Sequence, residues 1–80
     1  SLADKLKIMQ RLDNGYLESI FDIHTKYLLE KSYFSAQKIW QISFADYKIF
    51  EEMAVPTKIV FQDYINNYTL VLKLVGLKVL

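Results

Sequence analysis

Hydrophobic and polar residues follow one another along the chain with a spacing close to that of an α-helix. In the segment SLADKLKIMQRL, residues 1–12, the apolar residues Leu6, Met9 and Leu12 recur every third position. Over residues 16–31, 36–55 and 57 onward, apolar side chains again fill one broad arc of a helical wheel. The pattern therefore predicts four helices over these ranges.

The segments between these ranges carry signals for turns and helix ends. Asp13-Asn14-Gly15 is the clearest turn, and we interpret it as a helix–helix loop because its flanks lack the alternation of a β-hairpin. Ser35 suits a helix N-cap, and Pro56 ends the third helix because the residue before proline avoids the α conformation. Ser43 and Asp46 interrupt the apolar arc of residues 36–55, and we favour one continuous helix there over two shorter ones.

Together these elements predict an all-α fold, a small bundle of about four helices. Eighty residues make one domain, which we place at residues 1–80. The chain begins with Ser1, which is compatible with a domain excised from a larger protein. The expected core consists of apolar residues from all four helices, namely Leu6, Ile20, Tyr27, Ile39, Trp40, Phe50 and Val60.

The last segment, YTLVLKLVGLKVL from Tyr68 to Leu80, is the most apolar part of the chain. As the end of a long helix it adds a second apolar stripe, and we favour this interpretation although Gly76 costs a helix about 1 kcal/mol. As a terminal β-strand, the alternative, it places apolar groups on both faces and needs sheet neighbours. In either form its apolar surface requires cover.

Composition narrows the classes of function. The chain is 52% hydrophobic, contains no Cys and has a formal net charge of +1. A domain this small, without disulfides, gains stability from dense packing or oligomerisation. Its basic residues form no cluster, which argues against strong sequence-independent binding to phosphates. No segment is long and apolar enough to span a membrane as a helix, and we expect an intracellular protein.

Candidate chemistry is sparse. The chain has no Gly-rich phosphate loop, zinc-ligand pattern or nucleophile elbow. His24 is the only histidine, and we expect a structural role for it. Most of the aromatic residues in 33–50 fall on the apolar arc, which favours packing over base stacking. We therefore expect no catalytic activity, no cofactor and no metal site.

The leading functional hypothesis is a module for protein–protein interaction or self-association, with a protein partner or a homo-oligomer. It is based on the second apolar stripe and on one aromatic side chain at the edge of the polar surface. These residues are Ile59, Leu70, Leu74, Leu77 and Phe44.

The alternative hypothesis is a DNA-binding domain, because EEMAVPTKIVFQDYINNY is similar to a helix-turn-helix. Residues 57–68 would form the recognition helix and present Thr57, Lys58, Gln62 and Asn66 to nucleic acid. Asp63 and the absence of Arg in this segment count against it.

Overall fold

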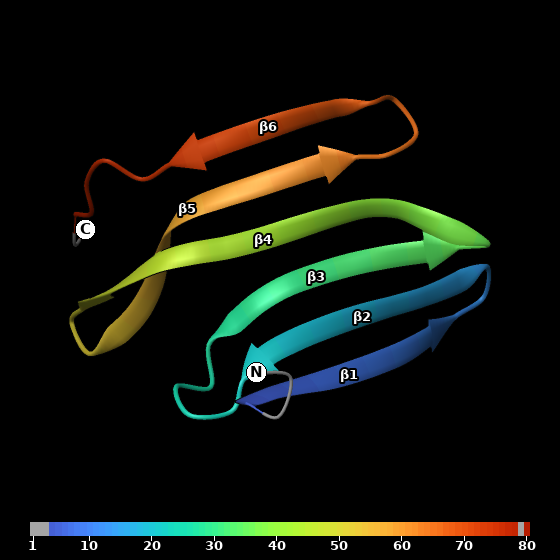
Figure 1. The fold of residues 1–80 in the computed structure, drawn as a ribbon. Coiled ribbons are helices and arrows are strands. Elements are labelled where there is room, and N and C mark those ends of the chain that lie inside the picture. The colour runs from blue at the N-terminus through green and yellow to red at the C-terminus, as the bar shows by residue number, and fades with distance from the viewer. Residues whose placement is uncertain (1–3, 79) are drawn as a thin grey trace.

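The computed structural model describes residues 4–78 and 80, and it forms one antiparallel sheet of six strands (Figure 1). Each strand pairs with the next one along the chain, so the order in the sheet is β1 to β6. The described residues contain no α-helix. The strands are β1 (Lys5–Leu12), β2 (Gly15–Asp22), β3 (Leu28–Ser35), β4 (Gln37–Phe50), β5 (Met53–Asp63) and β6 (Tyr68–Lys73).

The predicted all-α bundle is therefore wrong, and the expected helices are strands. The expected helix over residues 36–55 is β4 together with the start of β5, and the C-terminal segment forms a strand over Tyr68–Lys73. In β4 an alternation is present: Trp40, Ile42 and Phe44 lie two positions apart. Because 52% of the chain is hydrophobic, a helical arc can be filled even where the true period is two.

The turn at Asp13–Asn14 is also corrected, because it joins β1 and β2 as a two-residue hairpin. Leu12 pairs with Gly15 at its end. A Cβ atom on Gly15 would lie only 2.0 Å from the carbonyl oxygen of Phe34. The glycine is thus required by the close approach of β3, since any side chain there would clash with its backbone.

The turns on either side of β4 hold non-glycine residues in the left-handed region. Glu51 and Glu52, between β4 and β5, have φ angles of 50° and 67°, and Ala36, between β3 and β4, has a φ of 64°. This conformation costs an ordinary residue on the order of 1 kcal/mol. Positive φ at both central positions is the geometry that two-residue hairpins favour, because it matches the twist of the strands.

Pro56 does not end an element but lies inside β5, opposite Tyr47. Proline lacks the amide hydrogen that a ladder position in β5 would donate. The neighbouring Thr57 hydroxyl donates to the carbonyl oxygen of Asp46 at 2.5 Å. This bond joins β4 and β5 at Asp46 and Thr57, the step between the Ala45–Lys58 and Tyr47–Pro56 pairs at which the two strands are not paired.

The register divides the sheet into two faces of different composition. Successive residues of a strand point to opposite faces, and directly paired residues share a face. One face, here named the apolar face, is dominated by aliphatic and aromatic side chains. It comprises Leu6, Ile8, Gln10, Leu12, Leu17, Ser19, Phe21, Lys31, Tyr33, Trp40, Ile42, Phe44, Ile59, Phe61, Asp63, Tyr68, Leu70 and Leu72.

The opposite face, here named the polar face, carries most of the charged and amide side chains of the strands. A continuous polar line crosses it through directly paired residues of β2 to β6. This line consists of Glu18, Ser32, Gln41, Gln62 and Thr69.

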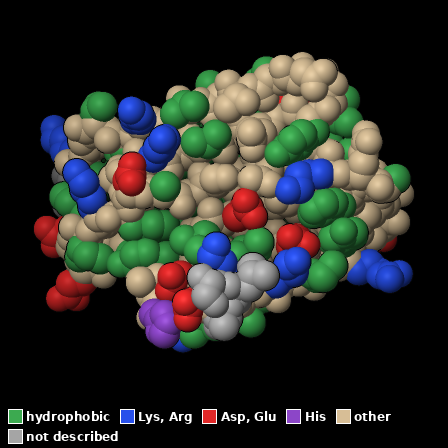
Figure 2. All heavy atoms as spheres, viewed as in Figure 1, with side chains coloured by type: hydrophobic (Ala, Val, Ile, Leu, Met, Phe, Trp, Pro, Cys, Tyr) green, Lys and Arg blue, Asp and Glu red, His purple; other side chains and the backbone are tan. Residues whose placement is uncertain are grey.

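A single sheet leaves the described residues without a hydrophobic core. No apolar side chain among them is buried, and only Ser19 and Ser32 are. The expected core is therefore wrong: Leu6 is 51% exposed, and the other six residues assigned to it are only half-buried. Figure 2 shows hydrophobic side chains at the surface, set among charged ones.

Candidate functional site

The apolar face carries a row of four aromatic rings across β3, β4, β5 and β6. The ring centroids of Tyr33 and Trp40 are 6.2 Å apart, those of Trp40 and Phe61 are 6.3 Å apart, and those of Phe61 and Tyr68 are 6.1 Å apart. These separations fall within the range of favourable aromatic pairs. We name Tyr33, Trp40, Phe61 and Tyr68 the aromatic row, and it forms the centre of the candidate site.

Two charged residues belong to the apolar face, and they differ in their surroundings. Asp63 lies at the end of β5, where its carboxylate accepts bonds from the amides of Ile65 and Asn66, each at 2.9 Å. It also accepts a bond from the Asn66 side-chain amide, and these bonds, the Asn66 side chain foremost, lower the pKa of Asp63. Lys31 lies in the middle of the face and has no hydrogen-bond or ion-pair partner among the described residues.

Several charged and amide side chains of the polar face have partners within the chain. Lys7 and Glu18 form an ion pair with a separation of 3.6 Å between their charged groups. The Lys38 ammonium donates to the Gln41 side-chain oxygen at 2.6 Å and lies 5.5 Å from the centre of the Phe34 ring. These contacts hold part of the charge of the polar face within the chain.

The residues predicted for association lie close together in the sheet, though not on a helix. Phe44 pairs with Ile59, and Leu70 pairs with Phe61, all on the apolar face. Leu74 and Leu77, beyond the end of β6, line a groove together with Ile59. The stripe predicted at helical spacing therefore corresponds to one end of the apolar face and the groove beside it.

Sequence reasoning missed the role of the aromatic row. Trp40 was assigned to a helical core, and Phe61 and Tyr68 were assigned to another helical stripe. Tyr33 was considered only as one of the aromatic residues in 33–50 expected to pack. The signal that identifies them is the alternation within each strand, combined with the pairing that aligns the strands. Only the first of these can be read from the sequence.

The residues of the DNA-binding alternative do not form one surface. The expected recognition helix is β5 and the turn that follows it, so no helix-turn-helix exists in the described chain. Thr57 bonds to β4, Lys58 and Gln62 lie on the polar face, and the Asn66 side chain bonds within the turn.

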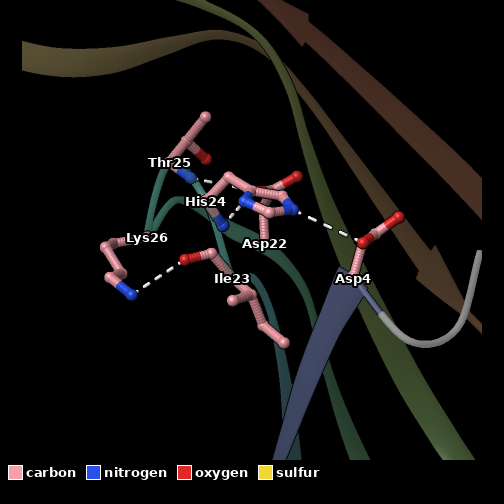
Figure 3. Close-up of polar contacts among 6 residues, drawn as sticks. All are labelled: Asp4, Asp22, Ile23, His24, Thr25 and Lys26. Atoms are coloured by element: carbon pink, nitrogen blue, oxygen red, sulfur yellow. Dashed lines mark hydrogen bonds and ion pairs between the residues drawn. The ribbon is translucent and has the colours of Figure 1, made fainter.

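Figure 3 shows the loop between β2 and β3, which contains His24. The amides of His24 and Thr25 donate to one Asp22 carboxylate oxygen at 2.8 and 2.9 Å, and these bonds, that of Thr25 foremost, lower the pKa of Asp22. The His24 ring nitrogen lies 3.4 Å from an Asp4 carboxylate oxygen. Lys26 adopts a positive φ of 68° and donates from its ammonium to the Ile23 carbonyl oxygen. The arrangement braces the loop, and every bond in it lies within the chain.

Metal sites and membrane-spanning helices are both absent from the described residues. No group of three or more His, Asp or Glu side chains in residues 4–78 and 80 is placed to hold a metal ion. In the same part of the chain, no helix has the length and apolar character needed to cross a membrane.

Comparison with protein-family models, with curated proteins and with solved structures finds no match for this chain. The features of the chain that bear on its function are the two faces of the sheet.

Proposed function

We propose that this protein is a self-association module in which the apolar face is covered by the same face of a second copy. The observation that supports this is the absence of any buried apolar side chain in the described residues, beside a face with four aromatic rings. Stable domains place two packed layers around a hydrophobic core. A second copy supplies the layer that one sheet lacks.

The size of the apolar face suits this role. Strands lie about 4.8 Å apart and advance about 3.4 Å per residue, so a sheet of this size presents roughly 600–700 Å² on each face. Stable protein interfaces bury about 800 Å² on each partner, counted over the rugged surface of the side chains. One face packed on another therefore reaches the area of a stable interface.

Lys31 sets a condition on the packing. A buried ammonium group without a partner is strongly unfavourable, whereas a long lysine stem can lie on apolar surface with its charge in water. Face-to-face packing must therefore leave the ammonium group of Lys31 in contact with solvent. Replacing Lys31 with Met removes this charge from the interface and should lower the dissociation constant of the assembly.

A pair of adjacent residues in β1 tests the proposal. Ile8 lies on the apolar face and Met9 on the opposite one, and they are 43% and 58% exposed. Ile8→Lys should halve the solution mass measured by light scattering, because it places a charge in the interface. Met9→Lys, the matched control, should leave the mass unchanged.

Circular dichroism establishes that both variants keep their strands before their masses are compared. Equal masses for Ile8→Lys and the unmodified protein would contradict association through the apolar face. A mass of one chain for the unmodified protein at high concentration would contradict self-association itself.

A further inference from the structure

The two outer edges of the sheet differ in how they are protected. β1 forms one edge and β6 the other, and each pairs with a single strand (Figure 1). An outer strand presents unpaired amide and carbonyl groups that can pair with another chain, and natural edges are commonly guarded by charged side chains. β1 carries Lys5, Lys7 and Arg11 within eight residues, whereas β6, with the sequence YTLVLK, carries only Lys73.

The hydrogen-bond phase shows which groups of β6 face outward. The Leu74 amide donates to the Thr57 carbonyl oxygen at 2.8 Å, in register with the β5–β6 pairing. Residues of an antiparallel strand bond alternately to one side and the other. Leu72 and Leu70 therefore bond to β5, and the backbone groups of Thr69, Val71 and Lys73 face away from the sheet.

The segment after β6 leaves this edge open. Residues 74–77 run toward the β4–β5 hairpin, where they line a groove with Ile49 and Phe50 (Figure 1). No described residue pairs with the outer side of β6. An edge strand with little charge and without proline or glycine is a template for strand addition. β6 is such a strand, because Lys73 is its only charged residue.

We propose that β6 pairs with β6 of a second copy, antiparallel and about a two-fold axis, to join two sheets into one. The inference rests on the proposed self-association and adds a second surface to it. In such a pairing, residues whose backbone groups face outward must lie opposite each other, and the apolar faces of both copies must lie on the same side. Only registers that pair odd-numbered residues with odd-numbered ones, and even with even, meet both conditions.

Among these registers, the one with Val71 opposite its own symmetry mate uses all the outward groups of the strand. Thr69 then lies opposite Lys73, and Leu70 lies opposite Leu72, which extends the apolar face across the junction. No like charges meet in this arrangement.

The corresponding pairing of β1 with itself is disfavoured. In the registers that pair most of the strand, two basic residues lie directly opposite each other, such as Lys5 and Arg11 or Lys7 and its symmetry mate, and directly opposed like charges destabilise a strand pair. Pairing of β1 with β6 is a head-to-tail contact, and it leads to open filaments instead of a closed dimer. The β6–β6 contact, in which both copies use the same surface, forms a closed dimer.

Proline at position 71 tests the edge without disturbing β5. Val71→Pro removes an outward amide hydrogen and blocks approach of a second strand, while the bonds to β5 come from the alternate residues. Met9→Pro is the matched control, because the Ile23-to-Asp4 bond at 2.9 Å places the Met9 backbone outward on the opposite edge. Val71→Pro should halve the mass measured by light scattering, and Met9→Pro should leave it unchanged.

The Ile8→Lys background separates this proposal from the proposed function. If both surfaces act, Ile8→Lys leaves a dimer, and adding Val71→Pro converts it to a monomer. If Ile8→Lys is already monomeric, the edge proposal fails and the apolar face alone associates. If Ile8→Lys changes nothing while Val71→Pro halves the mass, the edge stands and the proposed function fails.

Charge exchange at the axis provides a second variant set should Val71→Pro lose its strands by circular dichroism. In the Ile8→Lys background, Val71→Glu and Val71→Lys should each be monomeric, because identical charges meet at the two-fold axis. An equimolar mixture should recover the dimer mass. Failure of the mixture to recover it would overturn the β6–β6 contact.

Discussion

The two faces of this sheet are built from the same strands, yet their side chains differ in how far contacts within the chain satisfy them. On the polar face, several charged and amide side chains have partners within the chain, namely Lys7 with Glu18 and Lys38 with Gln41. On the apolar face, the tilted rings of the aromatic row contact one another side by side, but nothing described lies above them. Polar groups can be satisfied within one layer, whereas apolar groups need a second layer to leave water.

The two faces should differ most in the loss of unfolding free energy caused by alanine substitution at two adjacent residues of β4. Trp40 belongs to the aromatic row, and Gln41 lies on the polar face with bonds to Lys38 and Ser43. Trp40→Ala should lower the free energy of unfolding by about 2–3 kcal/mol, below the 3–5 kcal/mol typical of a fully buried site. Gln41→Ala should lower it by about 1 kcal/mol or less.

Urea denaturation of both variants at one protein concentration measures this contrast. If Gln41→Ala lowered the free energy of unfolding as much as Trp40→Ala, the two faces would contribute equally to stability, and the proposed difference between them would be contradicted.

A change outside both faces separates stability from association. Glu51 and Glu52 occupy positive φ angles in the β4–β5 turn, which Asn and Gly adopt at little cost. The double variant Glu51→Asn, Glu52→Gly should therefore raise the free energy of unfolding by about 1–2 kcal/mol. Its solution mass should equal that of the unmodified protein, and a changed mass would mean that the hairpin end takes part in assembly.

The smallest expected effect is the pH dependence set by the β5–β6 turn. The bonds from Asn66 and Ile65 lower the folded pKa of Asp63 below its ordinary value of 3.8. A carboxylate with a lowered folded pKa contributes stability that is present above the unfolded pKa and lost as pH falls through the folded one. Unfolding midpoints compared at pH 7 and pH 3 should therefore show a smaller loss in Asp63→Asn than in the unmodified protein.

Asp13→Asn serves as the control for this measurement, because the Asp13 side chain accepts no hydrogen bond from the described residues. It should keep the full acid sensitivity. Identical pH dependence in Asp63→Asn and Asp13→Asn would show that the turn carboxylate contributes nothing to stability.

Sequence reasoning failed on the fold for a physical reason that single elements make clear. In β1, Leu6, Met9 and Leu12 satisfy a helical stripe, while Leu6, Ile8 and Leu12 also satisfy a strand face. Because so many positions are apolar, the sequence fits both the helical period of about 3.6 residues and the strand period of two, and pairing with the neighbouring strand determines which structure forms. Turn positions were recognised at residues 13–15, but the hairpin that they close was not.

The candidate site was predictable in part. Ile59 and Leu70 were chosen for apolar spacing and Phe44 as an aromatic residue at the edge of the polar surface, and the register places all three on the apolar face. Trp40 was assigned to the core, because a pattern without strand pairing cannot show that its face is left uncovered. Self-association itself stays a prediction.

The sequence by itself determined the composition of the surfaces: a chain rich in apolar and aromatic side chains, without cysteine and with a nearly neutral charge, which needs cover to leave water. Only the tertiary structure decided where those side chains lie. Pairing of β3 with β4, and of β4 with β5, aligns residues such as Tyr33, Trp40 and Phe61 that are up to 28 positions apart. Contacts between distant residues arise from backbone register, and register depends on all the strands at once.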